Sequence, residues 1–255
     1  MSYGMLFDLT DRVALIVGAA GGLAGETCLG LAEFGATIVL ADIDSKGLIS
    51  ACSTLEEKGF KTGAKRVDVS DRTAVEELIK DLYTQFGRLD ILINFAGVVL
   101  PTPIEKIRIE EFQKIIDINL KGSFILAQES LSVMVPQRSG KIILVGSVSG
   151  HIGRPFSAHY AASKGGVHAM VRTMAVEMAK NNIQINSIAP VFTLTKMSED
   201  VLSDPQMKET IISTIPMGRL GLPSDLVGGM IFLSSSASDF ITGHTIFVDG
   251  GCTIS

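Results

Sequence analysis

The segment SAHYAASKGG, residues 157–166, places Tyr160 and Lys164 four residues apart, so on a helix both side chains lie on one face. A tyrosine hydroxyl can give a proton to a substrate oxygen or take one from it. Tyrosine and lysine with this spacing are also common on helices that have no catalytic role. The pair therefore indicates a proton-transfer centre only if the rest of the chain supports it.

Short apolar, β-branched segments alternate with amphipathic segments along the chain. The apolar segments are residues 12–17, 36–42, 89–97, 140–147, 183–190 and 244–250. Such runs are typical of strands buried on both faces of a parallel sheet. One intervening segment has Asp71 as a candidate N-cap and Gly87 at its end. The pattern predicts an α/β fold, a doubly wound parallel sheet of the Rossmann type, in one domain over residues 1–255.

Residues 196–223 are polar and rich in methionine, and they join two predicted strands. A compact fold usually makes such a connection shorter. We expect this segment to form a small helical lid over a substrate site within the same domain.

A glycine-rich turn follows the first predicted strand, with Gly18, Gly22 and Ala24 in a spacing that differs from GxGxxG. Such a turn lets the backbone approach a pyrophosphate at a helix N-terminus. Asp42 ends the second strand, where its carboxylate can bind both ribose hydroxyls and repels a 2′-phosphate. No Lys or Arg lies from Gly18 to Gly25 or beside Asp42, which favours NAD over NADP. Asp44 is the better candidate for capping the next helix.

Composition and charge limit the kinds of partner that the protein can bind. The chain has 255 residues, 46% of them hydrophobic, and a net charge of −5 with both signs mixed along its length. It lacks the basic stripe of nucleic-acid-binding proteins and an apolar run of about 18 residues that could cross a membrane. The three cysteines and four histidines lack the spacing of metal sites. We expect a cytoplasmic protein without a metal, a membrane partner or a nucleic-acid partner.

Eight segments, in this order, resemble the short-chain dehydrogenase/reductase family over nearly the whole chain. They are GAAGGLA at 18–24, DV at 68–69, NFAG at 94–97, Asn119 in DINLKG, Ser147 in VGSVSG, YAASK at 160–164, APVFTLT at 189–195 and ITGHTIFVDGG at 241–251. Members of this family are commonly tetramers, so the resemblance implies a homotetramer, with a dimer as the alternative.

The resemblance also implies catalytic roles. Tyr160 would be the general acid or base, and Lys164 would lower its pKa and hold the nicotinamide ribose. Ser147 would hydrogen-bond the substrate oxygen, and Asn119, inside a long helix, would hold a water in a proton relay.

Cofactor contacts are implied in the same way. Asp68 and Val69 would meet the adenine, and Thr193 and Thr195 would reach the carboxamide or the pyrophosphate. The full set is Gly18, Gly22, Leu23, Asp42, Ile43, Asp68, Val69, Asn94, Ala96, Gly97, Tyr160, Lys164, Pro190, Thr193 and Thr195.

The chain departs from the family pattern at four positions: Val17, Ala24, Phe95 and Val191. Val17 and Phe95 replace polar residues that tie two strands together, and we expect apolar contacts to compensate. Val191 is expected to narrow the space beside the nicotinamide.

The substrate depends on the loops around the site. His151, Arg154 and His159 are expected near its mouth, where Arg154 could bind an anionic group or, alternatively, remain solvated or pair with another subunit. Residues 189–226 are similar to gluconate 5-dehydrogenase-like enzymes. We expect hydride transfer between a secondary alcohol and a carbonyl on a polar sugar, sugar acid or polyol.

Two alternatives remain open. Apolar residues near the site, Val98, Val99, Leu100 and Phe156, would suit a 3-oxoacyl reductase or a dehydrogenase of hydrophobic alcohols or steroids. A non-catalytic NAD-binding regulator is the alternative from another class, and the presence of all four catalytic candidates disfavours it.

Overall fold

The computed structural model describes residues 3–195 and 203–255, which form a sheet of seven parallel strands in the order β3-β2-β1-β4-β5-β6-β7. The strands are β1 Val13–Val17, β2 Thr37–Asp42, β3 Thr62–Arg66, β4 Ile91–Asn94, β5 Gly140–Val145, β6 Ile183–Pro190 and β7 Thr245–Val248. The predicted doubly wound α/β fold is confirmed. Strand order reverses between β1 and β4, where the carboxyl ends of the strands leave a crevice in folds of this kind.

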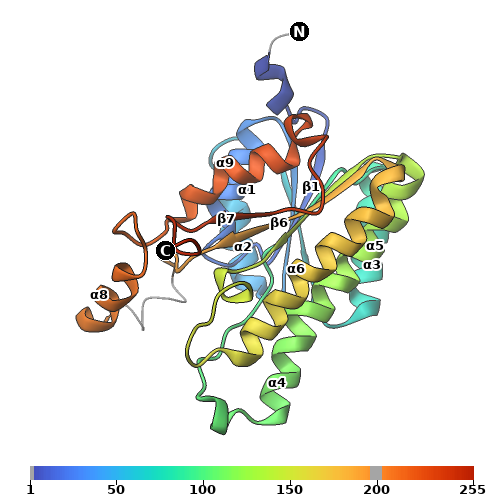
Figure 1. Cartoon of the computed structure of the whole chain (residues 1–255). Coiled ribbons are helices and arrows are strands. Elements are labelled where there is room, and N and C mark those ends of the chain that lie inside the picture. The colour runs from blue at the N-terminus through green and yellow to red at the C-terminus, as the bar shows by residue number, and fades with distance from the viewer. Residues whose placement is uncertain (1–2, 196–202) are drawn as a thin grey trace.

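Helices cover both faces of the sheet (Figure 1). One face carries α1 Ala24–Glu33, α2 Ser45–Glu56 and α9 Pro223–Ser234, and the other carries α3 Arg72–Phe86, α5 Gly122–Gln137 and α6 Ala158–Met178. Helix α4 Ile109–Ile116 packs against the start of α6, and α8 Pro205–Ser213 lies apart from both layers. The short helices are Tyr3–Phe7, Ile104–Lys106, Val148–Gly150, Ala179–Asn181 and Ser236–Ser238, and a π-helical turn spans Asp117–Lys121.

The strand sequences supply both cores. In β1, Val13, Leu15 and Val17 pack on the side of α3, α5 and α6, while Ala14 and Ile16 pack on the side of α1, α2 and α9. Alternate side chains of a strand point to opposite faces, so a continuous apolar run is what a sheet covered on both sides requires.

The expected helix boundaries are confirmed. The Asp71 carboxylate accepts the N–H of Thr73 at 3.0 Å at the start of α3, and Gly87 ends that helix with φ of 70°. Asp44 caps α2 by accepting the N–H of Lys46 at 3.0 Å. These caps satisfy helix-end groups that have no intrahelical partner.

The segment expected to be a lid lies partly outside the described residues, since 196–202 are not described. Its described part contains α8, whose first six residues are exposed. Beyond α8, Ile215 and Leu220 pack with Val148, Val191 and Cys252 in a small third core. The end of this segment is thus held against the turn that follows β5, and its action as a lid stays a prediction.

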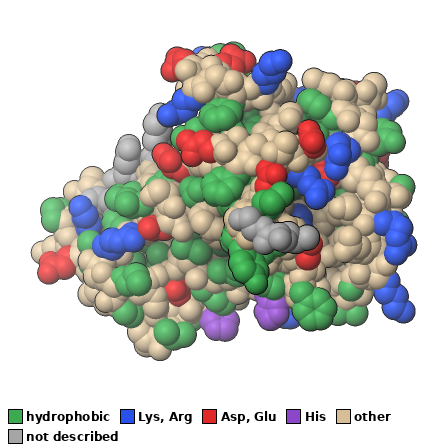
Figure 2. Space-filling model, turned by 90° about the horizontal axis from the view of Figure 1, so that it is seen from above, with side chains coloured by type: hydrophobic (Ala, Val, Ile, Leu, Met, Phe, Trp, Pro, Cys, Tyr) green, Lys and Arg blue, Asp and Glu red, His purple; other side chains and the backbone are tan. Residues whose placement is uncertain are grey.

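On the face shown in Figure 2, basic and acidic side chains are interspersed, as the mixed charge of the sequence predicts. Within residues 3–195 and 203–255, no helix combines the length and apolar character needed to cross a membrane.

Asp90 joins the beginnings of β1 and β4. Its side chain is 3% exposed, and its carboxylate accepts the N–H of Val13 at 2.9 Å. It also accepts two hydrogen bonds from the Arg88 guanidinium, both at 2.7 Å, and one from Arg12 at 3.2 Å. The carboxylate therefore fixes the register of these strands at the end opposite the crevice.

Asp90→Asn should lower the free energy of unfolding by about 2 kcal/mol, because charge-assisted hydrogen bonds to a buried carboxylate are replaced by weaker ones. Urea denaturation measures the change. The control is Asp81→Asn, which removes an exposed ion pair with Lys65 and should cost less than about 0.5 kcal/mol. Equal losses in the two variants would contradict the role given to Asp90.

Candidate active site

A cavity of about 440 Å³ lies at the carboxyl ends of the strands and brings together residues that are far apart in the sequence. The residues expected at a cofactor that line it are Gly18, Gly22, Leu23, Asp42, Ile43, Asp68, Val69, Ala96, Gly97, Tyr160, Lys164, Pro190 and Thr195. The reversal of strand order between β1 and β4 therefore coincides with the chemistry-bearing residues.

Asn94 and Thr193 do not line this cavity. The Asn94 amide donates to the Ser123 hydroxyl at 3.0 Å, and its oxygen accepts the N–H of Ala96 at 2.9 Å. The Thr193 hydroxyl donates to the Val191 carbonyl at 2.8 Å. The cofactor contact stays a prediction for both residues: Asn94 shapes the turn that carries Ala96, and the Thr193 hydroxyl is bonded within its own loop.

The glycine-rich turn is closely covered by backbone and side chains. Gly18 has φ of 76°, and a Cβ there would lie 2.5 Å from the Ala96 nitrogen. A Cβ on Gly22 would lie 2.7 Å from the Thr195 Cβ. Leu23, the N-cap of α1, makes no side-chain cap, and at the helix start the Ala24 N–H donates to the Gly21 carbonyl at 3.2 Å. This cradle fits a pyrophosphate at a helix N-terminus.

The other end of the cavity is acidic. Asp42 accepts the N–H of Ala20 through one oxygen and that of Asp44 through the other, both at 2.9 Å. Asp44 and Asp68 also line the cavity, and among its described lining residues Lys164 is the one cation. This end of the cavity therefore presents carboxylates to a ligand.

The departures from the family pattern are accommodated in different ways. The N–H of Phe95 donates to the Val17 carbonyl at 2.8 Å, so the main chain ties these strand ends together. Val17 and Phe95 pack on opposite cores, so each makes the apolar contacts expected of it with a different layer. Val191 packs with Val148 and Ile215 and does not line the cavity, and its effect on the space beside the nicotinamide stays a prediction.

Tyr160 and Lys164 face the cavity from the first turns of α6. Lys164 is 4% exposed. Its ammonium donates to the Val145 carbonyl at 2.8 Å and lies 5.9 Å from the centre of the Tyr160 ring. Burial lowers the pKa of Lys164 to about 8, because a charged amine loses its hydration there.

The Tyr160 pKa is shifted in the direction opposite to the one expected. Burial raises the pKa of Tyr160, and a hydrogen bond with Ser147 lowers it by less. Ser147 is placed by the turn after β5, where its hydroxyl also accepts the N–H of Ser149 at 3.1 Å. At neutral pH Tyr160 is therefore a phenol, ready to donate a proton to a carbonyl oxygen.

Asn119 lies in the π-helical turn Asp117–Lys121 and not within a regular helix as expected. Its oxygen accepts the Val98 N–H at 2.8 Å, and its amide donates to the Val98 carbonyl at 2.9 Å and to the Ser163 hydroxyl at 3.1 Å. π-Helical turns are frequent at functional sites because they re-aim one side chain. Here the turn directs Asn119 onto the loop after β4.

Gly97 brings Asn119 and Lys164 together. A Cβ on Gly97 would lie 3.3 Å from the Asn119 oxygen and 3.4 Å from the Lys164 ammonium. Glycine therefore allows the loop after β4 to pass close to both an amide and an amine, two of the groups expected at the catalytic centre.

The three residues expected at the substrate do not line the cavity. His151 is exposed, with its ring 5.0 Å from that of Phe247. Arg154 donates to the Thr214 hydroxyl at 3.3 Å and to the Cys252 sulfur at 2.8 Å, and so braces its loop against two distant segments.

His159 is fully buried, and its Nε2 lies 3.2 Å from an oxygen of Glu111 on α4. At the start of α6 this ring is thus held against α4, and a substrate contact of His159 stays a prediction. The sequence does not predict this contact, because Glu111 and His159 are 48 residues apart and belong to no shared motif.

His168 was not expected to matter, although it lies four residues beyond Lys164 on the same helix. Its ring is packed beneath Gly146, where a Cβ would lie 2.1 Å from the His168 Nε2. Burial, and after it the charges of Lys164, His151 and Arg172, lower the pKa of His168 to about 4. The neutral ring thus supports the turn that carries Ser147.

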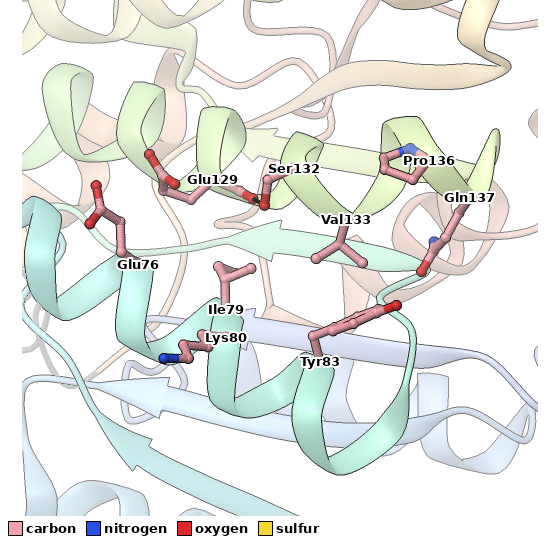
Figure 3. Close-up of a pocket in the computed structure, with 9 residues that line it drawn as sticks. All are labelled: Glu76, Ile79, Lys80, Tyr83, Glu129, Ser132, Val133, Pro136 and Gln137. Atoms are coloured by element: carbon pink, nitrogen blue, oxygen red, sulfur yellow. Dashed lines mark hydrogen bonds between the residues drawn. The ribbon is translucent and has the colours of Figure 1, made fainter.

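A second hollow, of about 480 Å³, lies between α3 and α5 and is drawn in Figure 3. It is lined by Glu76, Ile79, Lys80, Tyr83, Glu129, Ser132, Val133, Pro136 and Gln137. No expected site residue is among them, so the size of the hollow does not identify the site.

The fold and this site define a class of nicotinamide-dependent oxidoreductase. Residues 18–253 match a family model described as enoyl-(acyl carrier protein) reductase. The chain belongs to the short-chain dehydrogenase/reductase family and is an oxidoreductase of that type. The alternative of a non-catalytic regulator is therefore set aside.

Two curated relatives match over nearly their full lengths. The chain is 37% identical to a 3-oxoacyl-[acyl-carrier-protein] reductase of Thermotoga maritima, over 96% of this chain and 99% of the relative. It is 35% identical to the gluconate 5-dehydrogenase of Gluconobacter oxydans, over 100% of both chains.

Solved structures show the same architecture. A gluconate 5-dehydrogenase from Burkholderia cenocepacia, in complex with NADP and tartrate, superposes with a TM-score of 0.94 at 33% identity over 98% of both chains. An NAD⁺-bound xylitol dehydrogenase gives 0.92 at 29% identity, over 95% of this chain and 99% of that one.

Stability should fall by about 2 kcal/mol between pH 7 and pH 5 on account of His168 alone. Over this range His168 binds a proton in the unfolded chain, where its pKa is near 6.5, but not in the folded chain, where its pKa is about 4. Protonation therefore favours the unfolded chain as the pH falls. His168→Asn should remove this part of the pH dependence in urea denaturation, whereas His244→Gln, a change at an exposed residue, should keep it. An unchanged slope in His168→Asn would refute the assignment.

Proposed function

We propose that this oxidoreductase uses NAD to interconvert a secondary alcohol and a carbonyl on a polar sugar, sugar acid or polyol. The observation that carries the cofactor choice is the acidic end of the cavity, where Asp42 is held by two main-chain N–H groups. The substrate class rests on the full-length similarity to gluconate 5-dehydrogenases.

The similar structures differ in cofactor, since one contains NADP and another NAD⁺. Their names therefore do not decide the cofactor of this chain. A 2′-phosphate beside Asp42, Asp44 and Asp68 would meet three carboxylates without a nearby cation among the described lining residues. This charge balance supports NAD.

The residues of the cavity suit a dinucleotide: the Gly18 turn and the start of α1 would hold the pyrophosphate, and Lys164 would hold the nicotinamide ribose. When bound, the nicotinamide supplies or accepts a hydride. In reduction, the Tyr160 phenol donates its proton to the carbonyl oxygen, and Ser147 hydrogen-bonds the same oxygen. In oxidation, Tyr160 must first lose its proton, so its raised pKa makes this direction faster as the pH rises.

A second candidate function is the reduction of a 3-oxoacyl chain. It is supported by the similarity to the Thermotoga reductase and by two apolar residues of the cavity, Val98 and Val99. A long acyl chain would gain from contact with these side chains, whereas a sugar acid would not.

We further propose that the enzyme is a homotetramer. Apolar side chains exposed on the two long helices support this, namely Phe124 on α5, 41% exposed, and Val176 on α6, 80% exposed. A location in the cytoplasm stays a prediction of the sequence.

NAD reduction followed at the NADH absorbance should reveal turnover with a sugar acid or polyol, and Tyr160→Phe should lower kcat by about 10²–10⁴-fold, because the proton donor is lost. The panel should include sugar acids, polyols, hydroxy-steroids and 3-hydroxyacyl thioesters. Turnover confined to the thioesters would favour the second candidate. Equal turnover by Tyr160→Phe would refute the mechanism.

Asp42→Ala should lower kcat/KM for NAD by about 10–100-fold and narrow the preference over NADP, because hydrogen bonds from the ribose to a carboxylate are lost. The matched control is Asp44→Ala, which removes a carboxylate from the same cavity and a cap from α2. This control should retain most of the NAD preference. A wild-type enzyme that prefers NADP would overturn the cofactor proposal.

A further inference from the structure

Glu111 joins two loops that border the active site. One of its carboxylate oxygens accepts the hydroxyl hydrogen of Thr102, in the loop after β4, and the same oxygen lies 3.2 Å from the Nε2 of His159, at the start of α6. The main chain joins the loops as well, since the Thr102 N–H donates to the Phe156 carbonyl at 2.8 Å. We call this arrangement the Glu111 clamp.

The histidine of the clamp is buried, and its other side chains are partly exposed. His159 has no exposed surface, and the Glu111 side chain is 16% exposed. Because a carboxylate only accepts, Nε2 carries the hydrogen in this contact, and the buried Nδ1 of the same ring has no hydrogen-bond partner within the described residues. The pairing with Glu111 therefore accounts for the orientation of the ring.

The position of the clamp relates it to the substrate. Gly97, Val98 and Val99 line the cavity on one side, and Tyr160 lines it from α6. Asn119 holds the base of the loop after β4 through Val98. The clamp holds the same loop farther out, at Thr102, to the residue that directly precedes Tyr160.

The opposing loop needs such support. Phe156 has φ of 59°, a left-handed conformation that is rare for a bulky residue, and its ring is 58% exposed. Its carbonyl is the group bound by Thr102. Without the clamp, this loop would have fewer contacts that oppose a return to ordinary backbone angles.

We propose that Glu111 is a positioning residue that sets the width of the substrate site, by fixing the loop after β4 against the loop that leads into Tyr160. This inference rests on the proposed function. It concerns substrate binding and leaves the cofactor end, built by the Gly18 turn and Asp42, untouched.

Glu111→Ala should raise the KM of the substrate found in the screen by at least 10-fold, with kcat changed less than 3-fold and the Kd of NAD changed less than 2-fold. Glu111→Gln keeps an oxygen that can accept from Thr102 and His159, and should restore the KM to within 3-fold of wild type. The control Glu110→Ala removes an exposed carboxylate from the same helix turn and should leave all three constants unchanged.

Thr102→Val tests the other partner. It should raise KM in the same direction, and the double variant with Glu111→Ala should be no worse than Glu111→Ala alone, because both changes break one clamp. An unchanged KM in Glu111→Ala, a parallel loss of NAD affinity, or independent effects of the two changes would overturn the proposal.

Hydrogen exchange separates this inference from the proposed function. In Glu111→Ala, the amides of Val99, Leu100 and Thr102 and of the non-proline residues in 152–159 should exchange faster, while those of the Gly18 turn keep the wild-type rate. This readout needs no substrate. Faster exchange in a protein that shows no sugar-acid turnover would support the clamp and refute the substrate class, whereas unchanged exchange would refute the clamp.

Discussion

The site depends on the contact between the turn after β1 and the turn after β4, where the order of the strands reverses. At that point Gly18 lies so close to Ala96 that a Cβ would come within 2.5 Å of the main-chain nitrogen. The N–H of Phe95 and the carbonyl of Val17 complete the contact at 2.8 Å. Because no side chain separates the turns, the cavity beyond them opens at the strand ends, where the amide groups of α1 and the carboxylate of Asp42 can face the same ligand.

The catalytic side chains are polar groups buried away from water, and their burial lowers the stability of the fold. Lys164 and Tyr160 lie where burial disfavours their charged forms, and the pKa values of both shift accordingly. The neutral ring of His168 packs beneath the same turn, close to a lysine, so a second cation is excluded there. In this site the Tyr160 phenol keeps a proton that it can donate, and the Lys164 amine loses its charge at a lower pH than usual. The two large apolar cores offset the loss of stability that this burial causes.

Cofactor and substrate ends are built by different means. At the cofactor end, glycines and main-chain N–H groups form the surface, so the backbone itself determines the shape. At the substrate end, two loops are held by side chains, with Asn119 on Val98 and Glu111 on Thr102. Relatives of similar identity are named for different substrates. Under the proposal for Glu111, changes in the second set would alter substrate binding without disturbing the first set.

The sequence by itself determined the fold class, the caps at Asp71 and Asp44, and most residues of the cavity, because these depend on local periodicity, on turn chemistry and on segments that resemble a known family. The tertiary structure alone decided the π-helical turn at Asn119, the supporting role of Asn94, the burial of His159 against Glu111 and the upward shift of the Tyr160 pKa. Each of these depends on which distant groups surround a side chain and on how much water those groups exclude. Residue type and spacing determine neither the neighbours of a side chain nor its exposure to water.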